Sequence, residues 1–239
     1  MVNLPADHQG MPIEGDGAAP EGPVFRFGLP TLRLCLGFAN TLESRLTGHP
    51  RETLNSYGDL LAWGRRRGIL TERESRHLAQ EASRRAAEAA SILERAMALR
   101  EAVYRIFSAV AGSRSPQPAD LAILNATLAA ALASLRIVTM GNGFIWVWGQ
   151  GEEALDRVVW PVALSAAGLL TSGERRAVRE CAATNCAWLF LDTTRNRSRR
   201  WCDMKVCGNR AKARRHYERK KTMVNAGDRP NPYPARGGT

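Results

Sequence analysis

Four cysteines near the end of the sequence limit most strongly what this chain can fold into. They are Cys181, Cys186, Cys202 and Cys207, spaced C-x4-C, then fifteen residues, then C-x4-C. Two such loops, separated by the length of a strand–turn–strand, can place four thiolates around one tetrahedral Zn²⁺ ion with Zn–S bonds of about 2.3 Å. Because all four ligands would be sulfur, no coordination position remains for water. The pattern therefore predicts one structural zinc ion rather than a catalytic one.

Two disulfides, free structural thiols or an iron–sulfur cluster are the alternatives for these cysteines. Disulfides do not persist in a reducing compartment, and the sequence shows neither a secretory signal nor a run of eighteen apolar residues. We therefore expect a cytoplasmic protein that does not enter a membrane. The fifth cysteine, Cys35, lies far from the others and is expected to be a buried thiol.

The residues next to the cysteines predict a strand between the two pairs and a helix after the last one. Residues 188–192 are largely apolar and have the composition of a strand. Gly208 can adopt a positive φ directly after a ligand, and Asn209 is a favourable N-cap. Residues 210–221 contain neither Gly nor Pro, which favours a basic helix.

The segment from Cys181 to Lys220, CAATNCAWLFLDTTRNRSRRWCDMKVCGNRAKARRHYERK, resembles the CGNR zinc finger. Three other stretches resemble the ABATE domain that precedes this finger in bacterial proteins described as stress-induced transcription regulators. These are LCLGFANT (34–41), YGDLLAW (57–63) and VREC (178–181). The resemblance implies an ABATE-like domain followed by a zinc finger, and a bacterial regulator of transcription.

Positive charge is concentrated around the cysteines. Residues 175–221 hold 15 Lys and Arg against 4 Asp and Glu, a balance of +11, which equals the net charge of the whole chain. The other residues carry 19 charges of each sign. Zinc on four thiolates would leave about +9 on this segment. Such segregation is typical of a module that binds a polyanion, whereas a merely solvated surface usually mixes in acidic residues.

The remainder of the sequence predicts a mainly α fold with one small β-hairpin. Apolar residues recur every three or four positions, as in the stripe Ile92, Ala96, Leu99, Val103, Ile106 and Val110. A Gly-Asn-Gly turn at 141–143 lies between two apolar stretches and predicts the hairpin. A short strand is expected at 24–27. Helices are expected at 32–42, 56–68, from the capping box Thr71–Glu74 onward to about 110, at 120–132 and at 152–170.

These patterns divide the chain into four parts. Residues 1–22 are expected to be disordered, 23–172 to form a helical ABATE-like domain, 173–222 the CGNR-type zinc finger, and 223–239 a disordered tail. A helix is expected from Ser172 to about Cys181. Because no flexible linker would then separate the two domains, the zinc module should be docked on the helical domain.

No catalytic motif is visible. The sequence contains no P-loop, no G-x-S-x-G and no dinucleotide-binding fingerprint, and its four histidines are scattered. We therefore expect a binding protein rather than an enzyme.

Arginine dominates the basic residues, which suits bidentate contacts to phosphate or guanine. The hypothesis is that the last helix enters the major groove of double-stranded DNA while the loop before Cys202 holds phosphates. RNA or an acidic protein are the alternative partners, and Arg199 or Arg200 could instead pair with Asp192. Trp188 and Trp201 are expected to form the small core of the module. The candidate contacts are Arg195, Arg197, Arg199, Arg200, Lys205, Arg210, Lys212, Arg214, Arg215 and Arg219.

A second hypothesis concerns regulation by a small-molecule effector. Asn40, Trp146 and Trp148 could line a ligand pocket in the N-terminal domain. The alternatives are that Asn40 holds a neighbouring segment by a hydrogen bond and that the tryptophans pack against helices. The sequence indicates neither the effector nor the oligomeric state.

Overall fold

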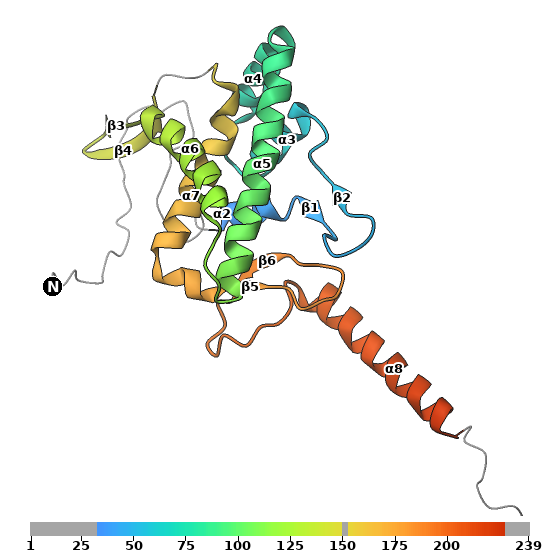
Figure 1. The fold of residues 1–239 in the computed structure, drawn as a ribbon. Helices are drawn as coiled ribbons and strands as arrows, with labels where there is room; N and C mark the ends of the chain where they lie inside the picture. Colours follow the sequence, from blue (N-terminus) through green and yellow to red (C-terminus); the bar gives the residue numbers. More distant parts are fainter. Residues whose placement is uncertain (1–32, 150–152, 228–239) are drawn as a thin grey trace, which may run out of the picture.

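The computed structural model describes residues 33–149 and 153–227, and it confirms the predicted fold class (Figure 1). Helices predominate, and three antiparallel strand pairs accompany them. The elements, in chain order, are α2 (Leu34–Ala39), β1 (Leu42–Glu43), β2 (Arg51–Glu52), α3 (Tyr57–Arg66), α4 (Glu72–Arg84), α5 (Ala86–Ala111), α6 (Pro118–Ser134), β3 (Leu135–Met140), β4 (Gly143–Trp148), α7 (Trp160–Thr171), β5 (Val178–Glu180), β6 (Leu189–Leu191) and α8 (Asn209–Gly227).

The long helix α5 is the centre of the fold. Its predicted stripe is buried: Ile92, Leu99 and Ile106 are each no more than 3% exposed. The helices α2, α3 and α6 pack against it, and α7 packs on α2 and α6, so that all of them contribute to one continuous core. Burial of this size is the main source of folding free energy. The predicted capping box at the start of α4 is also present, because the Thr71 and Glu74 side chains each bond the other's backbone amide.

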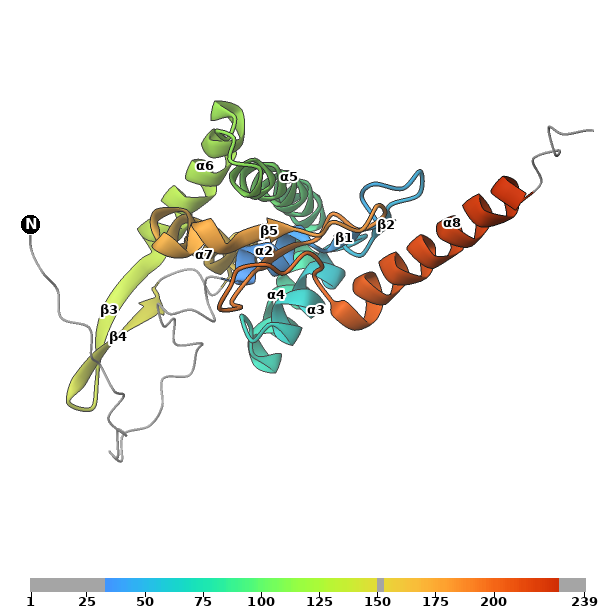
Figure 2. The ribbon, with the colours of Figure 1, turned by 90° about the horizontal axis from the view of Figure 1, so that it is seen from below.

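Helix α6 and the β3–β4 hairpin form the opposite end of the domain from α8 (Figure 2). The hairpin turn was predicted correctly, and Gly141 has a φ of +54° at its first position. The helix expected at 120–132 is present as α6, but its start differs from the expected one. Helix α6 starts earlier, with Gln117 as N-cap and Pro118 in the first turn, while the Asp120 carboxylate is buried and accepts hydrogen bonds from Arg105.

The helix expected between residues 172 and 181 is also wrong. A short 3-10 turn spans Gly173–Ala177 and is followed by strand β5. Strand β5 pairs antiparallel with β6, in the register Val178↔Leu191 and Glu180↔Leu189. Long-range pairing with β6 therefore overrides the local helical tendency of this stretch. The result preserves the expected rigid connection, since no linker separates the two parts of the chain.

Helix α8 leads away from the rest of the molecule in both views (Figures 1 and 2). Its 19 residues give it a length of about 28 Å. It extends to Gly227, so residues 223–227, which were expected to belong to the disordered tail, continue the helix. The expectations for residues 1–22, 24–27 and 228–239 lie outside the described residues. In the described part of the chain, no helix combines the length and the apolar character needed to span a bilayer.

A buried ion pair fixes the short β1–β2 ribbon to α5. The Arg100 guanidinium, 2% exposed, donates hydrogen bonds of 2.6 and 2.8 Å to the two carboxylate oxygens of Glu52. Burial alone would raise the pKa of Glu52, but the hydrogen bonds and charge of Arg100, together with the backbone amides of Leu54 and Thr53, outweigh it and hold that pKa below the ordinary value. On the same ribbon, Arg51 forms an exposed pair with Glu43.

Replacing Arg100 tests this attachment. Arg100→Ala leaves the Glu52 carboxylate without its partner and should lower the free energy of unfolding by about 3–5 kcal/mol. Arg51→Ala on the exposed pair should cost about 0–1 kcal/mol. Because the Glu52 pKa is lowered on folding, the contribution of this carboxylate is present above its unfolded pKa, about 4.3, and is lost as pH falls through the folded value. Urea denaturation of both variants at neutral and acid pH measures the difference.

Candidate metal centre and basic surface

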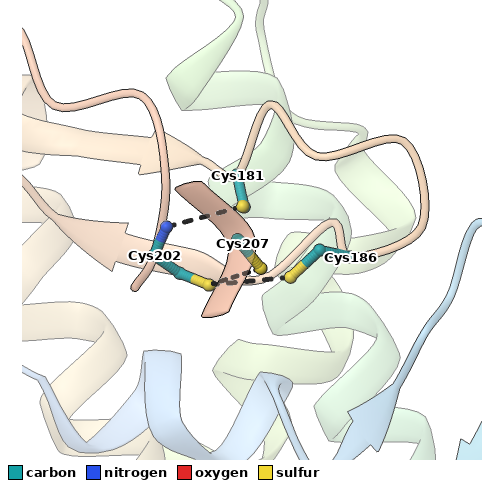
Figure 3. Close-up of side chains that lie close together, drawn as sticks. All are labelled: Cys181, Cys186, Cys202 and Cys207. Atoms are coloured by element: carbon teal, nitrogen blue, oxygen red, sulfur yellow. Dashed lines mark hydrogen bonds between the residues drawn. The ribbon is translucent and has the colours of Figure 1, made fainter. Parts of the chain in front are cut away.

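The four predicted ligands converge at one point between the β5–β6 pair and α8 (Figure 3). Their sulfur atoms all lie within 4.8 Å of one another. The Cys186 and Cys202 sulfurs are 3.6 Å apart, and those of Cys202 and Cys207 are 3.7 Å apart. The backbone N–H of Cys202 also donates to the Cys181 sulfur at 3.4 Å. This arrangement suits one tetrahedral ion bound by four sulfurs.

The acid–base chemistry of the cluster also fits a dication. Hydrogen bonding with Cys202 lowers the pKa of the Cys186 thiol to about 5. Burial raises the pKa of Cys207 to about 11, and hydrogen bonding to Cys186 raises the pKa of Cys202. One thiolate therefore forms readily, whereas four negative sulfurs this close require a cation among them. Zn²⁺ supplies that charge and prefers sulfur ligands, so these cysteines form one structural zinc site.

Asp203 organises the second cysteine loop, a role that the sequence analysis missed. Its carboxylate accepts a hydrogen bond from the Val206 amide and caps the π-helical turn Met204–Gly208. Helix α8 continues directly from this turn. The backbone angles of Asn209, φ −66° and ψ −40°, are helical, so Asn209 is not an N-cap. The sequence signal for this cap is an aspartate placed three residues before the residue whose amide donates to its carboxylate.

Gly208 does not adopt the positive φ that was expected, because the positive-φ glycines of the described residues are Gly68 and Gly141. A Cβ atom at position 208 would lie 2.4 Å from the Met204 sulfur, so the exposed Met204 side chain would have to move to accommodate it. The left-handed residue beside a ligand is instead Ala187, with a φ of +59° directly after Cys186. Nothing in the residue type of an alanine indicates this conformation.

The loop before Cys202 is held by Asp192 at the end of β6. Its carboxylate accepts hydrogen bonds from the amide and hydroxyl of Thr194 and from the backbone amide of Arg199. Asp192 thus holds the loop to the strand through the Arg199 backbone amide, and not through the Arg199 or Arg200 side chain that was considered as an alternative. The Arg199 guanidinium lies 4.8 Å from the centre of the Phe190 ring and donates to the carbonyls of Trp201 and Cys202. It supports the module from outside, so it is the weakest of the predicted nucleic-acid contacts.

All ten predicted contact residues are exposed. Arg214 is the one among them with an acidic partner among the described residues, at 3.6 Å from Glu218, and it also donates to Thr184. Arg200 lies over the Trp201 ring, and Trp201 packs with Trp188 against the cysteines in the small core that the sequence predicted. The rest of the set carries its positive charge on the surface without a carboxylate within 4 Å in the described part of the chain: Arg195, Arg197, Arg199, Arg200, Lys205, Arg210, Lys212, Arg215 and Arg219.

The three residues proposed for a ligand pocket have hydrogen-bonding and packing partners in the structure. The Asn40 amide donates to the Leu189 carbonyl and accepts from the Leu189 amide, both at 2.9 Å. Asn40 therefore has the alternative role, that of holding a neighbouring segment. Trp148 packs on Trp160 of α7 with ring centres 5.3 Å apart, and Trp146 lies further along the same strand face, 36% exposed.

A cleft of about 300 Å³ opens beside the sulfur cluster instead. One wall comes from the β1 end of the N-terminal domain and the other from the two cysteine loops and the start of α8. Its lining residues are Glu43, Ser44, Asn185, Cys186, Trp188, Cys202, Asp203, Val206, Cys207 and Arg210.

Comparison with family models matches the helical domain and the cysteine cluster separately. Residues 32–173 match the ABATE model, described as "Putative stress-induced transcription regulator". Residues 177–220, which include all four zinc ligands, match the CGNR zinc finger. The first match covers more than half of the chain. The protein belongs to the ABATE family. No curated protein matches the sequence in the corresponding search.

Polar contacts join the ABATE domain to the zinc finger. Besides the Asn40–Leu189 pair, the hydroxyl groups of Tyr104 and Ser108 on α5 donate to the Glu180 carboxylate, at 3.3 and 2.6 Å. Glu180 directly precedes the first zinc ligand, Cys181. Helices α2 and α5 thus hold both strands on which the first cysteine loop is built, and the zinc finger has a fixed position on the ABATE domain.

Removing one ligand sulfur should destabilise the zinc finger but not the ABATE domain. Cys202→Ser should abolish stoichiometric zinc binding and unfold the zinc finger, while the ABATE core, which contains no ligand, stays folded. The matched control is Cys35→Ala, because Cys35 is buried outside the cluster. Metal analysis and hydrogen exchange report the two effects. Full zinc occupancy in Cys202→Ser would contradict the four-sulfur site.

Replacing Asn40 should loosen the zinc finger without removing its metal. Asn40→Ala leaves the amide and carbonyl of Leu189, a residue 2% exposed, without partners, at a cost of about 1–3 kcal/mol. We expect faster amide exchange in β6 with unchanged zinc content. Asn185→Ala is the control, since Asn185 is half-buried and has no hydrogen bond among the described residues. Equal exchange in both variants would show that Asn40 does not hold the finger.

Proposed function

We propose that this protein is a DNA-binding transcription regulator, rather than an enzyme, whose CGNR zinc finger presents a basic surface to double-stranded DNA. The observation that carries the proposal is the unpaired positive charge on the zinc finger. Nine exposed Lys and Arg side chains there have no acidic partner among the described residues. Clustered charge of this kind attracts phosphates and is strengthened by the release of counterions from DNA.

Many arginines of the ABATE domain, unlike most of those of the zinc finger, lie close to a carboxylate. Arg65 and Arg76 lie within 4 Å of Glu72, Arg84 lies 2.6 Å from Glu81, and the buried Arg100 pairs with Glu52. Solubility or general surface chemistry would distribute pairs of this kind over both domains. Exposed arginines without a carboxylate within 4 Å among the described residues also occur on the ABATE domain, for example Arg66, Arg95 and Arg114. A functional demand for free cations accounts for their concentration on the zinc finger.

Helix α8 has the form needed to reach into a groove. It is about 28 Å long and extends away from the body of the protein (Figure 2). Lys212, Arg215 and Arg219 follow one another at intervals of three and four and therefore share a face. Arg214 lies on a different face, where Thr184 and Glu218 engage it. The face of Lys212, Arg215 and Arg219 is thus the one that we assign to DNA.

The loop from Arg195 to Arg200 is the second part of the proposed interface. Asp192 fixes its two ends through Thr194 and Arg199, and zinc fixes the residues that follow. The side chains of Arg195, Arg197 and Arg200 therefore extend from a loop of defined shape. A loop of this kind can contact phosphates on either side of a groove while the helix reads base edges.

Binding to an acidic protein or to RNA would use the same charges. DNA is favoured because the family description assigns its members to transcription control and because an exposed α-helix fits the major groove of B-DNA, about 12 Å wide. The corresponding groove of A-form RNA is too narrow for side chains to read.

Salt dependence tests the proposal. If about six phosphates are contacted, the logarithm of the binding constant for a short duplex should fall with the logarithm of salt concentration with a slope near −5. Replacing Lys212, Arg215 and Arg219 together by Ala should reduce that slope by about 3. Fluorescence anisotropy of a labelled duplex measures both slopes.

The control variant replaces Arg65, Arg76 and Arg84 of the ABATE domain by Ala, which removes the same charge from exposed positions. It should bind DNA like the wild type. No binding at low salt, or an equal loss in both triple variants, would overturn the proposal. Competition with RNA and with an acidic peptide decides between the partners.

A further inference from the structure

The four zinc ligands are not equally covered. Cys181, Cys186 and Cys207 are 4%, 8% and 4% exposed, whereas Cys202 is only half-buried. The 300 Å³ cleft reaches Cys202 together with Cys186 and Cys207, but Cys181 is not part of its lining. Of the ligands that line the cleft, Cys202 is therefore the residue most exposed to solvent.

Two further sulfurs lie within easy reach of Cys202. The distances are 3.6 Å to Cys186 and 3.7 Å to Cys207, and both of these residues also line the cleft. A disulfide bond is about 2.05 Å long, so a closing movement of about 1.6 Å would join either sulfur to Cys202. An oxidised Cys202 would thus have a resolving thiolate on two sides.

We propose that Cys202 is the site at which hydroperoxides oxidise this protein, and that the resulting disulfide with Cys186 or Cys207 releases the zinc ion. The Cys202 thiolate attacks one peroxide oxygen, the O–O bond breaks, and the departing oxygen takes up a proton and leaves as water or an alcohol. The second thiolate then attacks the sulfenic acid sulfur. The S–O bond breaks as the S–S bond forms, and the hydroxide leaves as water after taking up a proton.

The electrons balance within this scheme. The two sulfurs lose two electrons, which reduce the peroxide, while zinc stays in its +2 state. Zinc loses two of its four ligands and therefore its site. No other oxidant or reductant is required.

Cys35 provides a contrast within the same chain. It is 0% exposed, its backbone amide donates to the Ser165 hydroxyl, and burial raises the pKa of its thiol to about 12. A neutral, inaccessible thiol reacts slowly with peroxides. Cys35 should therefore stay reduced when Cys202 is oxidised.

Oxidation at Cys202 would remove the support of α8. Cys207 belongs to the turn that continues into α8. Outside that turn, the helix is held by the hydrogen bond from Arg214 to Thr184 on the first cysteine loop. Loss of zinc separates the two loops. This consequence rests on the proposed function: peroxide would then switch off DNA binding, and a thiol reductant with zinc would restore it.

The experiment treats the full-length, zinc-loaded protein with hydrogen peroxide in the absence of oxygen. A chromogenic chelator records zinc release, and differential alkylation with peptide mass spectrometry identifies the oxidised cysteines. We expect zinc release together with a disulfide that contains Cys202, while Cys35 remains alkylatable. A disulfide without Cys202, oxidation of Cys35 at the same rate, or full retention of zinc at millimolar peroxide would overturn the proposal.

Variants at Val206 test the route through the cleft. Its side chain is 53% exposed and lines the cleft beside Cys202, so it can be changed without altering a ligand. Val206→Phe should slow zinc release several-fold and Val206→Ala should not slow it. Equal rates in all three proteins would show that the cleft does not control access and would count against the proposal.

Measurements of DNA binding separate this inference from the proposed function. If Cys202 is oxidised and zinc is released but the reduced protein binds no duplex, the oxidation site stands and the proposed function fails. If the reduced protein binds DNA and peroxide leaves Cys202 intact, the proposed function stands and the oxidation site fails.

Discussion

Coordination of one zinc ion by four sulfurs is the interaction on which the rest of the zinc finger depends. The loops that carry the cysteines are short, and their apolar core consists of Ala183, Phe190, two tryptophans and the ligands themselves. A segment of this size and charge could not bury enough surface to fold unaided. The ion also neutralises the sulfurs, which could not otherwise all be ionised. It therefore fixes both the loop of arginines and the start of α8.

The ABATE domain gives this small module a fixed position. The Asn40 amide pairs with both backbone groups of Leu189, and α5 holds Glu180 next to the first ligand. These contacts bind the two strands that carry the first cysteine loop. A shift in the position of α2 or α5 would therefore move the zinc ligands. Through Cys207 it would also move the start of α8. Direct contact makes such coupling possible, since a rigid element connects the two domains.

The sequence allowed the zinc ligands, the fold class and most helices to be predicted, because each depends on local signals: cysteine spacing, apolar periodicity and capping residues. It did not allow the role of Asn40 to be decided, because its partner Leu189 lies 149 residues away. Strand β5 was mistaken for a helix for the same reason, since its pairing with β6 is a tertiary effect. The Asp203 cap was missed although its signal, an aspartate three residues before the amide that donates to it, is local. Ala187 was missed because an alanine gives no indication of left-handed backbone.

Amide hydrogen exchange of the zinc-loaded protein, with and without a saturating DNA duplex, tests the central claim most directly. If free cations on a rigid, zinc-held surface bind DNA, the duplex should slow amide exchange in residues 195–200 and in the first turns of α8. Exchange in the ABATE core should stay unchanged. Removal of zinc should abolish that protection. Protection confined to the ABATE domain, or protection of the basic segment that persists without zinc, would contradict the account.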